Sequence, residues 1–134
     1  MSAVEAHPRR LLVTGGAGFI GANFVRHWRV AHPDDAIVVV DALTYAGNRD
    51  NLSGALDERC RLEVLDINAT ERIAELLRQD RIDTIVHFAA ESHVDRSISG
   101  PDVFVQANVL GTLSLLNAAR TVWQVEGQAP HAHR

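Results

Sequence analysis

A glycine-rich segment between an apolar run and an amphipathic stretch constrains this chain more than any other feature. Residues 14–21 read TGGAGFIG, with glycines at positions 15, 18 and 21. The run before them, 10–14, is dominated by Leu11, Leu12 and Val13, which is typical of a strand buried on both faces. After the glycines, apolar side chains recur at helical spacing and predict one helix stripe over about 19–31: Ile20, Phe24 and Trp28. The chain is therefore expected to pass from a buried strand through glycines directly into a helix.

The rest of the chain repeats this alternation of strand and helix. Further strands are predicted over 36–41, 61–65 and 84–89, and the polar segment 44–54 reads as a loop with one short helix. Thr70 is the expected N-cap of a helix with Ile73, Leu76 and Leu77 on its inner face. Pro101 suits the first turn of a last helix, which carries Val103, Phe104, Ala107, Leu110 and Leu113.

This order predicts the fold class. Strands that alternate with helices through short links require a parallel sheet with right-handed crossovers and helices on both faces. We therefore expect an α/β fold, a Rossmann-type doubly wound sheet of four strands in the order 3-2-1-4. The domain is predicted over residues 9–123, and residues 124–134 are read as a polar tail.

Composition excludes several classes of function. Apolar residues make up 46% of the 134 residues, yet no stretch is long enough for a membrane span, and no signal peptide is visible. The single cysteine, Cys60, allows no internal disulfide, so a cytoplasmic location is expected. The net charge is −4 and the basic residues, all arginine, are scattered, so nucleic acid is not an expected partner. Neither His87 nor His93 has partners at metal-ligand spacing, and no metal site is predicted.

The glycines predict a dinucleotide site. Gly15 permits a tight turn off the strand, Gly18 lets the backbone approach a pyrophosphate, and Gly21 allows close packing of the helix. The amino end of that helix then offers N–H groups to the phosphates. The alternative is a plain structural turn, because glycines alone are weak evidence; the position between a strand and a helix favours the dinucleotide.

Asp41 predicts the identity of that dinucleotide. It ends the second predicted strand, where a carboxylate can accept hydrogen bonds from an adenosine ribose. A carboxylate there repels a 2′-phosphate, so the expected cofactor is NAD and not NADP. Two alternatives stay open: Asp41 as a turn or cap residue, and an offset of its charge by Arg49.

Three segments together resemble a known family. The glycine spacing is similar to that of the extended short-chain dehydrogenase/reductase family, and two more segments resemble signature stretches of its dTDP-glucose 4,6-dehydratases. These are DALTYAGN at 41–48 and FAAESHVDRSI at 88–98. The resemblance covers residues from about 11 to 119.

The resemblance implies contacts for particular residues. Phe19 and Ile20 should lie against the cofactor, residues 41–44 should hold the adenosine ribose, and residues 88–92 should pass beneath the nicotinamide half. Ser92 should also touch the sugar nucleotide, and Ala107 stands where relatives often carry a contacting threonine. The complete set of expected cofactor residues, which includes a pair that flanks the adenine, is Gly15, Gly18, Phe19, Ile20, Gly21, Asp41, Ala42, Leu43, Thr44, Asp66, Ile67, Phe88, Ala89, Ala90, Glu91, Ser92 and Ala107. The alternative for Asp66, Phe88, Ala89 and Ala90 is an ordinary place at a strand end or in the core.

The catalytic residues that the resemblance implies are not in this chain. The family uses a tyrosine with a lysine four residues later, and its dehydratases use a Thr-Asp-Glu segment. Here Tyr45 is the only tyrosine, no lysine occurs, and Thr-Asp-Glu is absent. We therefore expect the NAD-binding half of an enzyme that converts dTDP-glucose to its 4-keto-6-deoxy product, truncated before its C-terminal substrate part and inactive alone.

Several alternatives remain at this level. The chain could come from another NAD-dependent sugar-nucleotide enzyme, an epimerase or a decarboxylase, or be a non-catalytic NAD-binding module. The sequence leaves open the nucleotide that the sugar carries and the oligomeric state, for which a homodimer of the full-length enzyme is one expectation.

Overall fold

The protein forms a four-stranded parallel sheet with helices on both faces. The computed structural model describes residues 8–43, 47–88 and 110–127. The strand order is β3-β2-β1-β4, which confirms the predicted Rossmann-type order. The strands are β1 (Arg10–Thr14), β2 (Ala36–Asp41), β3 (Cys60–Val64) and β4 (Thr84–His87).

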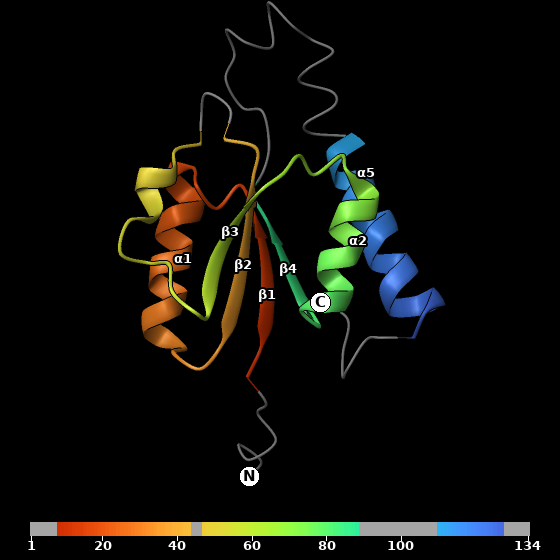
Figure 1. Cartoon of the computed structure of the whole chain (residues 1–134), viewed down its shortest axis with the longest axis horizontal. Coiled ribbons are helices and arrows are strands. Elements are labelled where there is room, and N and C mark those ends of the chain that lie inside the picture. The colour runs from red at the N-terminus through yellow and green to blue at the C-terminus, as the bar shows by residue number, and fades with distance from the viewer. Residues whose placement is uncertain (1–7, 44–46, 89–109, 128–134) are drawn as a thin grey trace, which may run out of the picture.

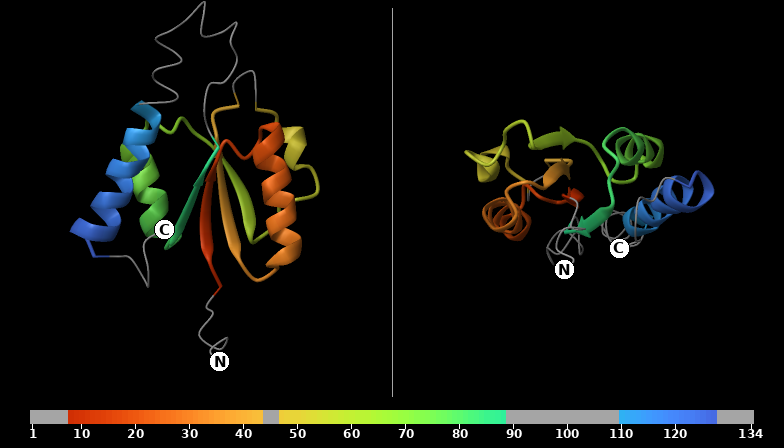
Figure 2. Two further views of the ribbon diagram at one scale, coloured as in Figure 1. Left: turned by 180° about the vertical axis from the view of Figure 1, so that it is seen from behind. Right: turned by 90° about the horizontal axis from the view of Figure 1, so that it is seen from below.

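The helices divide between the two faces. Figures 1 and 2 show α1 (Phe19–Ala31) and the short 3₁₀ helix η2 (Arg49–Leu52) on one side of the sheet. On the other side lie α2 (Thr70–Gln79) and α5 (Gly111–Ala119), which continues as the π-helix η4 (Arg120–Val125). The predicted helix opening at Pro101 falls partly outside the described residues. The short helix expected in segment 44–54 is η2.

Alternation along the strands builds two separate cores. Leu11 and Val13 of β1 face α1, whereas Leu12 between them faces α2 and α5. All three are fully buried, because a central parallel strand is covered on both faces. The predicted inner face of α2 is confirmed, since Ile73, Leu76 and Leu77 are all buried.

Element ends differ from the sequence prediction in three places. β3 begins at Cys60 and ends at Val64, each one residue earlier than predicted. β4 ends at His87, although the N–H of Phe88 still donates to the carbonyl of Thr14 at 2.9 Å. The prediction of Thr70 as N-cap is wrong, because Ala69 occupies that position and Thr70 is the first helical residue. The Thr70 hydroxyl instead contacts the hydroxyl of Ser114 on α5, at 2.5 Å.

The predicted stripe of α1 is partly wrong. Ile20 is 68% exposed, and the buried residues of the helix are Gly21, Ala22 and Val25. Apolar character at Ile20 therefore does not mark the inner face, which runs through Gly21, Ala22 and Val25. Phe24 and Trp28 do pack against the α1-side core, with ring centroids 5.5 Å apart.

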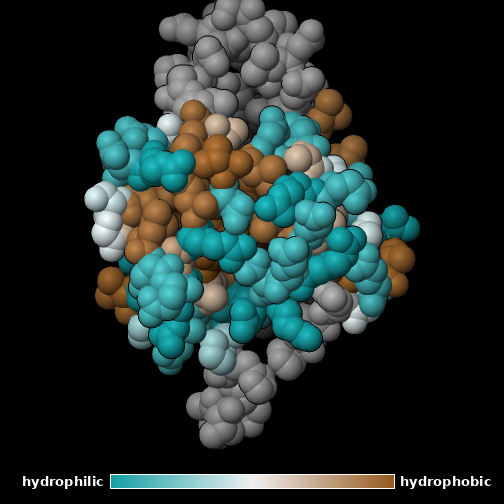
Figure 3. All heavy atoms as spheres, in the orientation of Figure 1, coloured by the Kyte–Doolittle hydropathy of each residue, from teal (hydrophilic) through white to brown (hydrophobic). Residues whose placement is uncertain are grey.

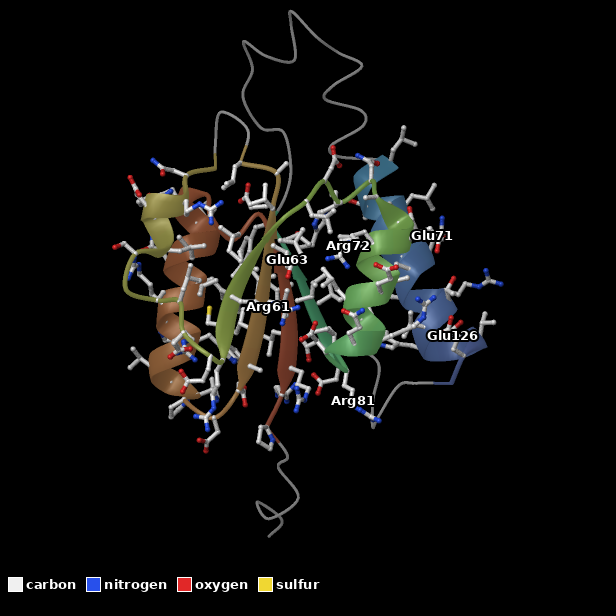
Figure 4. All side chains as sticks on the ribbon, viewed as in Figure 1. Arg61, Glu63, Glu71, Arg72, Arg81 and Glu126 are labelled. Atoms are coloured by element: carbon white, nitrogen blue, oxygen red, sulfur yellow. The ribbon has the colours of Figure 1, made fainter. Side chains whose placement is uncertain are left out.

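An ion-pair network ties the edge strand β3 to α2. Arg61 makes two hydrogen bonds of 2.7 Å to the carboxylate of Asp80 and one of 3.1 Å to Glu63. Glu63 lies 3.6 Å from Arg72 of α2, and Figure 4 shows these side chains converging. Figure 3 shows that hydrophilic residues cover much of this face and that hydrophobic residues gather in its upper part. Val64, the last residue of β3, is 52% exposed. Charged side chains on an edge strand discourage pairing with another chain.

The end of the described chain is held to α2. Arg78 makes hydrogen bonds of 2.8 and 2.9 Å to the two carboxylate oxygens of Glu126. The helical segment itself runs to Val125, past residue 123, at which the predicted domain ends. Among the described residues, no helix combines the length and the apolar character that crossing a membrane requires.

Candidate functional site

The carboxyl ends of the strands and the start of α1 meet at one edge of the sheet. Parallel register places Thr14 at the end of β1 beside Val40 of β2 and His87 of β4. Open parallel sheets bind ligands at this edge. Most of the predicted site residues that the structure describes lie on the segments that leave it.

Gly15 makes the turn off β1, as predicted. Its φ of 68° lies in the left-handed region that favours glycine. Its N–H donates to the carbonyl of Val40 at 2.8 Å, and its own carbonyl accepts from the N–H of Gly18 at 3.2 Å. The turn is thus closed on itself and anchored to β2.

Two glycines lie where a side chain would collide with a neighbouring segment. A Cβ on Gly21 would lie 2.2 Å from the carbonyl oxygen of Gly15, so the packing role predicted for Gly21 is directed at the turn. A Cβ on Gly16 would lie 2.6 Å from a methyl group of Val39. Gly16 was not among the predicted site residues. The doubled glycine in the sequence was the available signal for it.

The amino end of α1 has an open approach. Gly18 is its N-cap, no side chain caps it, and its first turn carries no acidic residue. The first N–H groups of any helix have no partner within the helix, and they attract anions. Phe19 and Ile20 in this turn are 80% and 68% exposed, so two large apolar side chains stand beside those N–H groups. This arrangement fits a ligand that has both a phosphate and an apolar face.

Asp41 links the end of β2 to the glycine segment. One carboxylate oxygen accepts the N–H of Ala17 at 2.9 Å, and the other accepts the N–H of Leu43 at 2.8 Å. Asp41 is only 9% exposed, and a Cβ on Gly47 would approach its carboxylate to 2.4 Å. Each carboxylate oxygen has a second lone-pair direction, so Asp41 can serve as a turn residue and still accept from a ligand hydroxyl.

The carbonyl of Ala17 completes this clamp. It accepts the N–H of Asn48 at 3.1 Å and the side-chain amide of Asn51 at 2.7 Å. Sequence reasoning missed both asparagines as supports of the glycine segment, although Asn48 lies within the quoted stretch 41–48. Both main-chain groups of Ala17 are therefore bonded: its N–H to Asp41 at the end of β2, and its carbonyl to the two asparagines that follow.

Two further residues predicted near the ribose follow Asp41 directly. Ala42 is exposed, and Leu43 is half-buried with a φ of 57°, unusual for a residue with a side chain. Thr44 lies outside the described residues. Arg49, considered as an offset for the Asp41 charge, is exposed on η2.

The predicted adenine pair lies in the turn after β3. Asp66 is exposed, and one of its oxygens accepts the main-chain N–H of Asn68 at 2.8 Å. Ile67 is 7% exposed and packs in the core on the α2 side, where its carbonyl accepts from the hydroxyl of Ser114 at 2.7 Å.

At the end of β4, Phe88 and His87 point into the protein. Phe88 is half-buried and its ring centroid lies 5.4 Å from that of Phe24, which agrees with the core alternative for its side chain. His87 lies between Thr14, whose hydroxyl is 2.6 Å from Nδ1, and Thr112, whose hydroxyl is 3.1 Å from Nε2. Burial lowers the pKa of His87, which favours its neutral form. The predicted residues Ala89, Ala90, Glu91, Ser92 and Ala107 lie outside the described residues.

Other reactive side chains in the described ranges carry no separate site. Burial raises the pKa of the Cys60 thiol to about 11, so it stays protonated and unreactive at neutral pH. Within residues 8–43, 47–88 and 110–127, no cluster of three or more metal-ligating side chains is present.

Comparison with known proteins places this geometry in a family context. The family profile described as GDP-mannose 4,6 dehydratase matches residues 12–131. A dTDP-glucose 4,6-dehydratase of Mycobacterium tuberculosis is 50% identical over 111 residues, which make up 83% of this chain and 33% of that protein. The chain thus spans about a third of the length of the curated relatives it matches.

Solved structures give a similar result. The dTDP-glucose 4,6-dehydratase DesIV from Streptomyces venezuelae, solved with NAD bound, is 55% identical with a TM-score of 0.75; the match covers 82% of this chain and 35% of that one. The UDP-glucose 4-epimerase of Thermotoga maritima is 29% identical with a TM-score of 0.70, over 82% of this chain and 33% of that one.

Proposed function

This chain belongs to the GDP-mannose 4,6 dehydratase family, and we propose that it is the NAD-binding part of a dTDP-glucose 4,6-dehydratase. The observation that carries the proposal is the clamp between Asp41 and Ala17, at the uncapped amino end of α1. The clamp fixes the glycine segment where a pyrophosphate would lie, and it presents a carboxylate to the adjoining ribose.

Each half of the cofactor has proposed partners in this chain. The N–H groups of the first turn of α1, near Gly18, would bind the pyrophosphate, because the helix dipole favours anions there. Phe19 and Ile20 would cover it, and the Asp41 carboxylate would accept from the ribose hydroxyls. When bound, NAD would supply the acceptor for a hydride from the sugar. The residues of this chain would bind it, orient it and exclude water from it.

Residues that the structure does not describe remain part of the proposal. Thr44 would complete the ribose contacts, and residues 89–92 with Ala107 would line the nicotinamide half. Ser92 would reach the sugar nucleotide. The domain over 9–123 and a homodimer of the full-length enzyme also remain proposals.

NAD is favoured over NADP for an electrostatic reason. A 2′-phosphate would stand beside the Asp41 carboxylate, and like charges at that distance repel. Arg49 is the first residue of η2, directly after Asn48, and is exposed. Its charge is therefore screened by solvent and offsets the repulsion only weakly.

The dehydratase is favoured over the epimerase by sequence identity. The chain is 55% identical to a solved dehydratase and 29% identical to a solved epimerase, at similar coverage. The substrate we propose is dTDP-glucose. The catalytic tyrosine and lysine of such an enzyme would come from outside these 134 residues, since the chain has no lysine.

Calorimetric titration tests the proposal. NAD is expected to bind the purified chain more tightly than NADP, and no turnover of dTDP-glucose is expected from the chain alone. Tighter binding of NADP, or no binding of either dinucleotide by a folded sample, would contradict the cofactor assignment. Product formation by the chain alone would show that its catalytic residues lie within it.

A further inference from the structure

An arginine of α1 holds the short helix η2 in place. The Nη2 atom of Arg26 donates to the main-chain carbonyls of Asn51 and Ser53, both at 2.7 Å. That nitrogen carries two hydrogens, so each carbonyl takes one of them. Asn51 belongs to η2 and Ser53 follows it directly, and Figures 1 and 2 show η2 beside α1. Arg26 therefore ties the carboxyl end of η2 to the middle of α1.

The same helix η2 reaches back to the glycine segment. The side-chain amide of Asn51 donates to the carbonyl of Ala17 at 2.7 Å, and the N–H of Asn48 donates to it at 3.1 Å. A carbonyl oxygen has two lone pairs, and these two donors occupy both. A path of hydrogen bonds thus runs from Arg26 through Asn51 to Ala17.

The occupied carbonyl leaves the first turn of α1 open. If the helix began one turn earlier, the carbonyl of Ala17 would accept the N–H of Gly21, four residues later. Within the described ranges that bond is absent, although the next one, from the N–H of Ala22 to the carbonyl of Gly18, is present at 2.9 Å. The N–H groups that precede Ala22 in α1 therefore stay available for an anion.

We propose that Arg26 is a positioning residue for the phosphate site, which holds η2 against α1 and so keeps the Asn51 amide on the Ala17 carbonyl. The inference rests on the proposed function, because it takes the pyrophosphate of NAD as the ligand at this end of α1. Arg26 lies about 10 Å along the helix from Phe19, and its guanidinium is turned to η2. It would therefore act on the cofactor only through Asn51.

The test compares Arg26→Met with Arg29→Met in calorimetric titrations of the purified chain with NAD. Arg29 is the matched control, because it lies on the same helix and pairs with Asp57, between η2 and β3, but not with η2 itself. Arg26→Met should bind NAD about fivefold more weakly than the wild type, the equivalent of about one hydrogen bond. Arg29→Met should bind NAD as the wild type does. Unchanged affinity in Arg26→Met, or an equal loss in Arg29→Met, would overturn the proposal.

Two further variants separate positioning from general stability. Arg26→Lys keeps a cation with several donors, so it should recover part of the NAD affinity that Arg26→Met loses. In a chain that already carries Asn51→Ala, Arg26→Met should cost little further affinity, because the path through Asn51 is already broken. Fully additive losses would show that Arg26 acts by another route, contrary to the proposal.

A readout without cofactor tests the hold on η2 directly. The N–H groups of Asn51 and Ser53 close the turns of η2 with hydrogen bonds of 2.9 and 3.0 Å. Their hydrogen exchange should be faster in Arg26→Met than in the wild type, and unchanged in Arg29→Met. Unaltered exchange would show that Arg26 does not hold η2, and the inference would fail even if NAD binds. If the wild type binds no NAD, the proposed function fails and the role of Arg26 at a phosphate site fails with it.

Discussion

The carboxylate of Asp41 accepts the main-chain N–H of Ala17 at 2.9 Å, in a buried hydrogen bond that joins β2 to the glycine segment. Ala17 is itself fully buried, so water cannot replace this acceptor. The residue expected to recognise a ribose is thus also a structural support of the phosphate site. Its substitution should therefore affect both stability and binding.

Replacing Asp41 by Ala should lower the free energy of unfolding by about 1–3 kcal/mol, because the N–H of Ala17 loses its acceptor. Asp41→Asn should be milder, since the amide keeps one oxygen for one of the two N–H groups. Urea denaturation measures this, with the exposed Asp50→Ala as control. Equal stability of Asp41→Ala and the wild type would show that the bond does not support the fold.

Gly21→Ala should destabilise the chain by about 3 kcal/mol or more, since backbone atoms cannot move aside as a flexible side chain would. The new Cβ would lie 2.2 Å from the carbonyl oxygen of Gly15. Gly54→Ala is the matched control: Gly54 has a φ of 81° and nothing within 4 Å of its Cβ position. It should cost only about 1–2 kcal/mol, from backbone strain. Thermal unfolding of the two variants tests whether Gly21→Ala is the less stable one. If Gly54→Ala were less stable, the close packing at Gly21 would be contradicted.

Phe19→Ser should weaken NAD binding roughly five- to tenfold through lost apolar contact. It should leave the free energy of unfolding within about 0.5 kcal/mol of the wild type, because the side chain is 80% exposed. Val30→Ser is the control, since Val30 is 84% exposed near the other end of α1. Calorimetric titration and urea denaturation separate the two effects. Unchanged NAD affinity in Phe19→Ser, or a similar loss in Val30→Ser, would argue against a cofactor at this end of the helix.

His87 should make stability fall with acidification. Burial lowers its pKa below the ordinary 6.5, so under weakly acidic conditions the unfolded chain takes up a proton that the folded chain does not. The free energy of unfolding should therefore decrease as the pH falls from about 6.5 toward the lowered pKa, by at most about 1.4 kcal/mol per pH unit. Above that range His87 should contribute no slope.

The control for this prediction is His87→Gln, which can still bond both threonine hydroxyls but does not titrate. Urea denaturation between pH 5 and 7 should give a shallower dependence in His87→Gln than in the wild type. Parallel curves would mean that His87 does not cause the slope. A steeper curve in the variant would mean that His87 opposes the loss of stability with acidification, contrary to the prediction.

Much of the fold could be predicted from the pattern of neighbouring residues in the sequence. β1, β2 and α1 have the predicted bounds, because continuous apolar runs and helical spacing are properties of neighbouring residues. The end of β3 was harder to predict, since a shift of one residue depends on pairing with β2. Which side of α1 faces inward was also not a local property: Ile20 has the right spacing but is 68% exposed.

Residue pattern alone was enough to predict the order of strands and helices along the chain, the turn at Gly15, and the place of Asp41 at the end of its strand. Tertiary structure alone decided which distant groups meet there: Asp41 with Ala17, and Ser114 with Ile67. The reason is physical. A turn or an amphipathic stripe follows from residues a few positions apart, whereas a hydrogen bond between distant segments exists only after packing has fixed their register and separation.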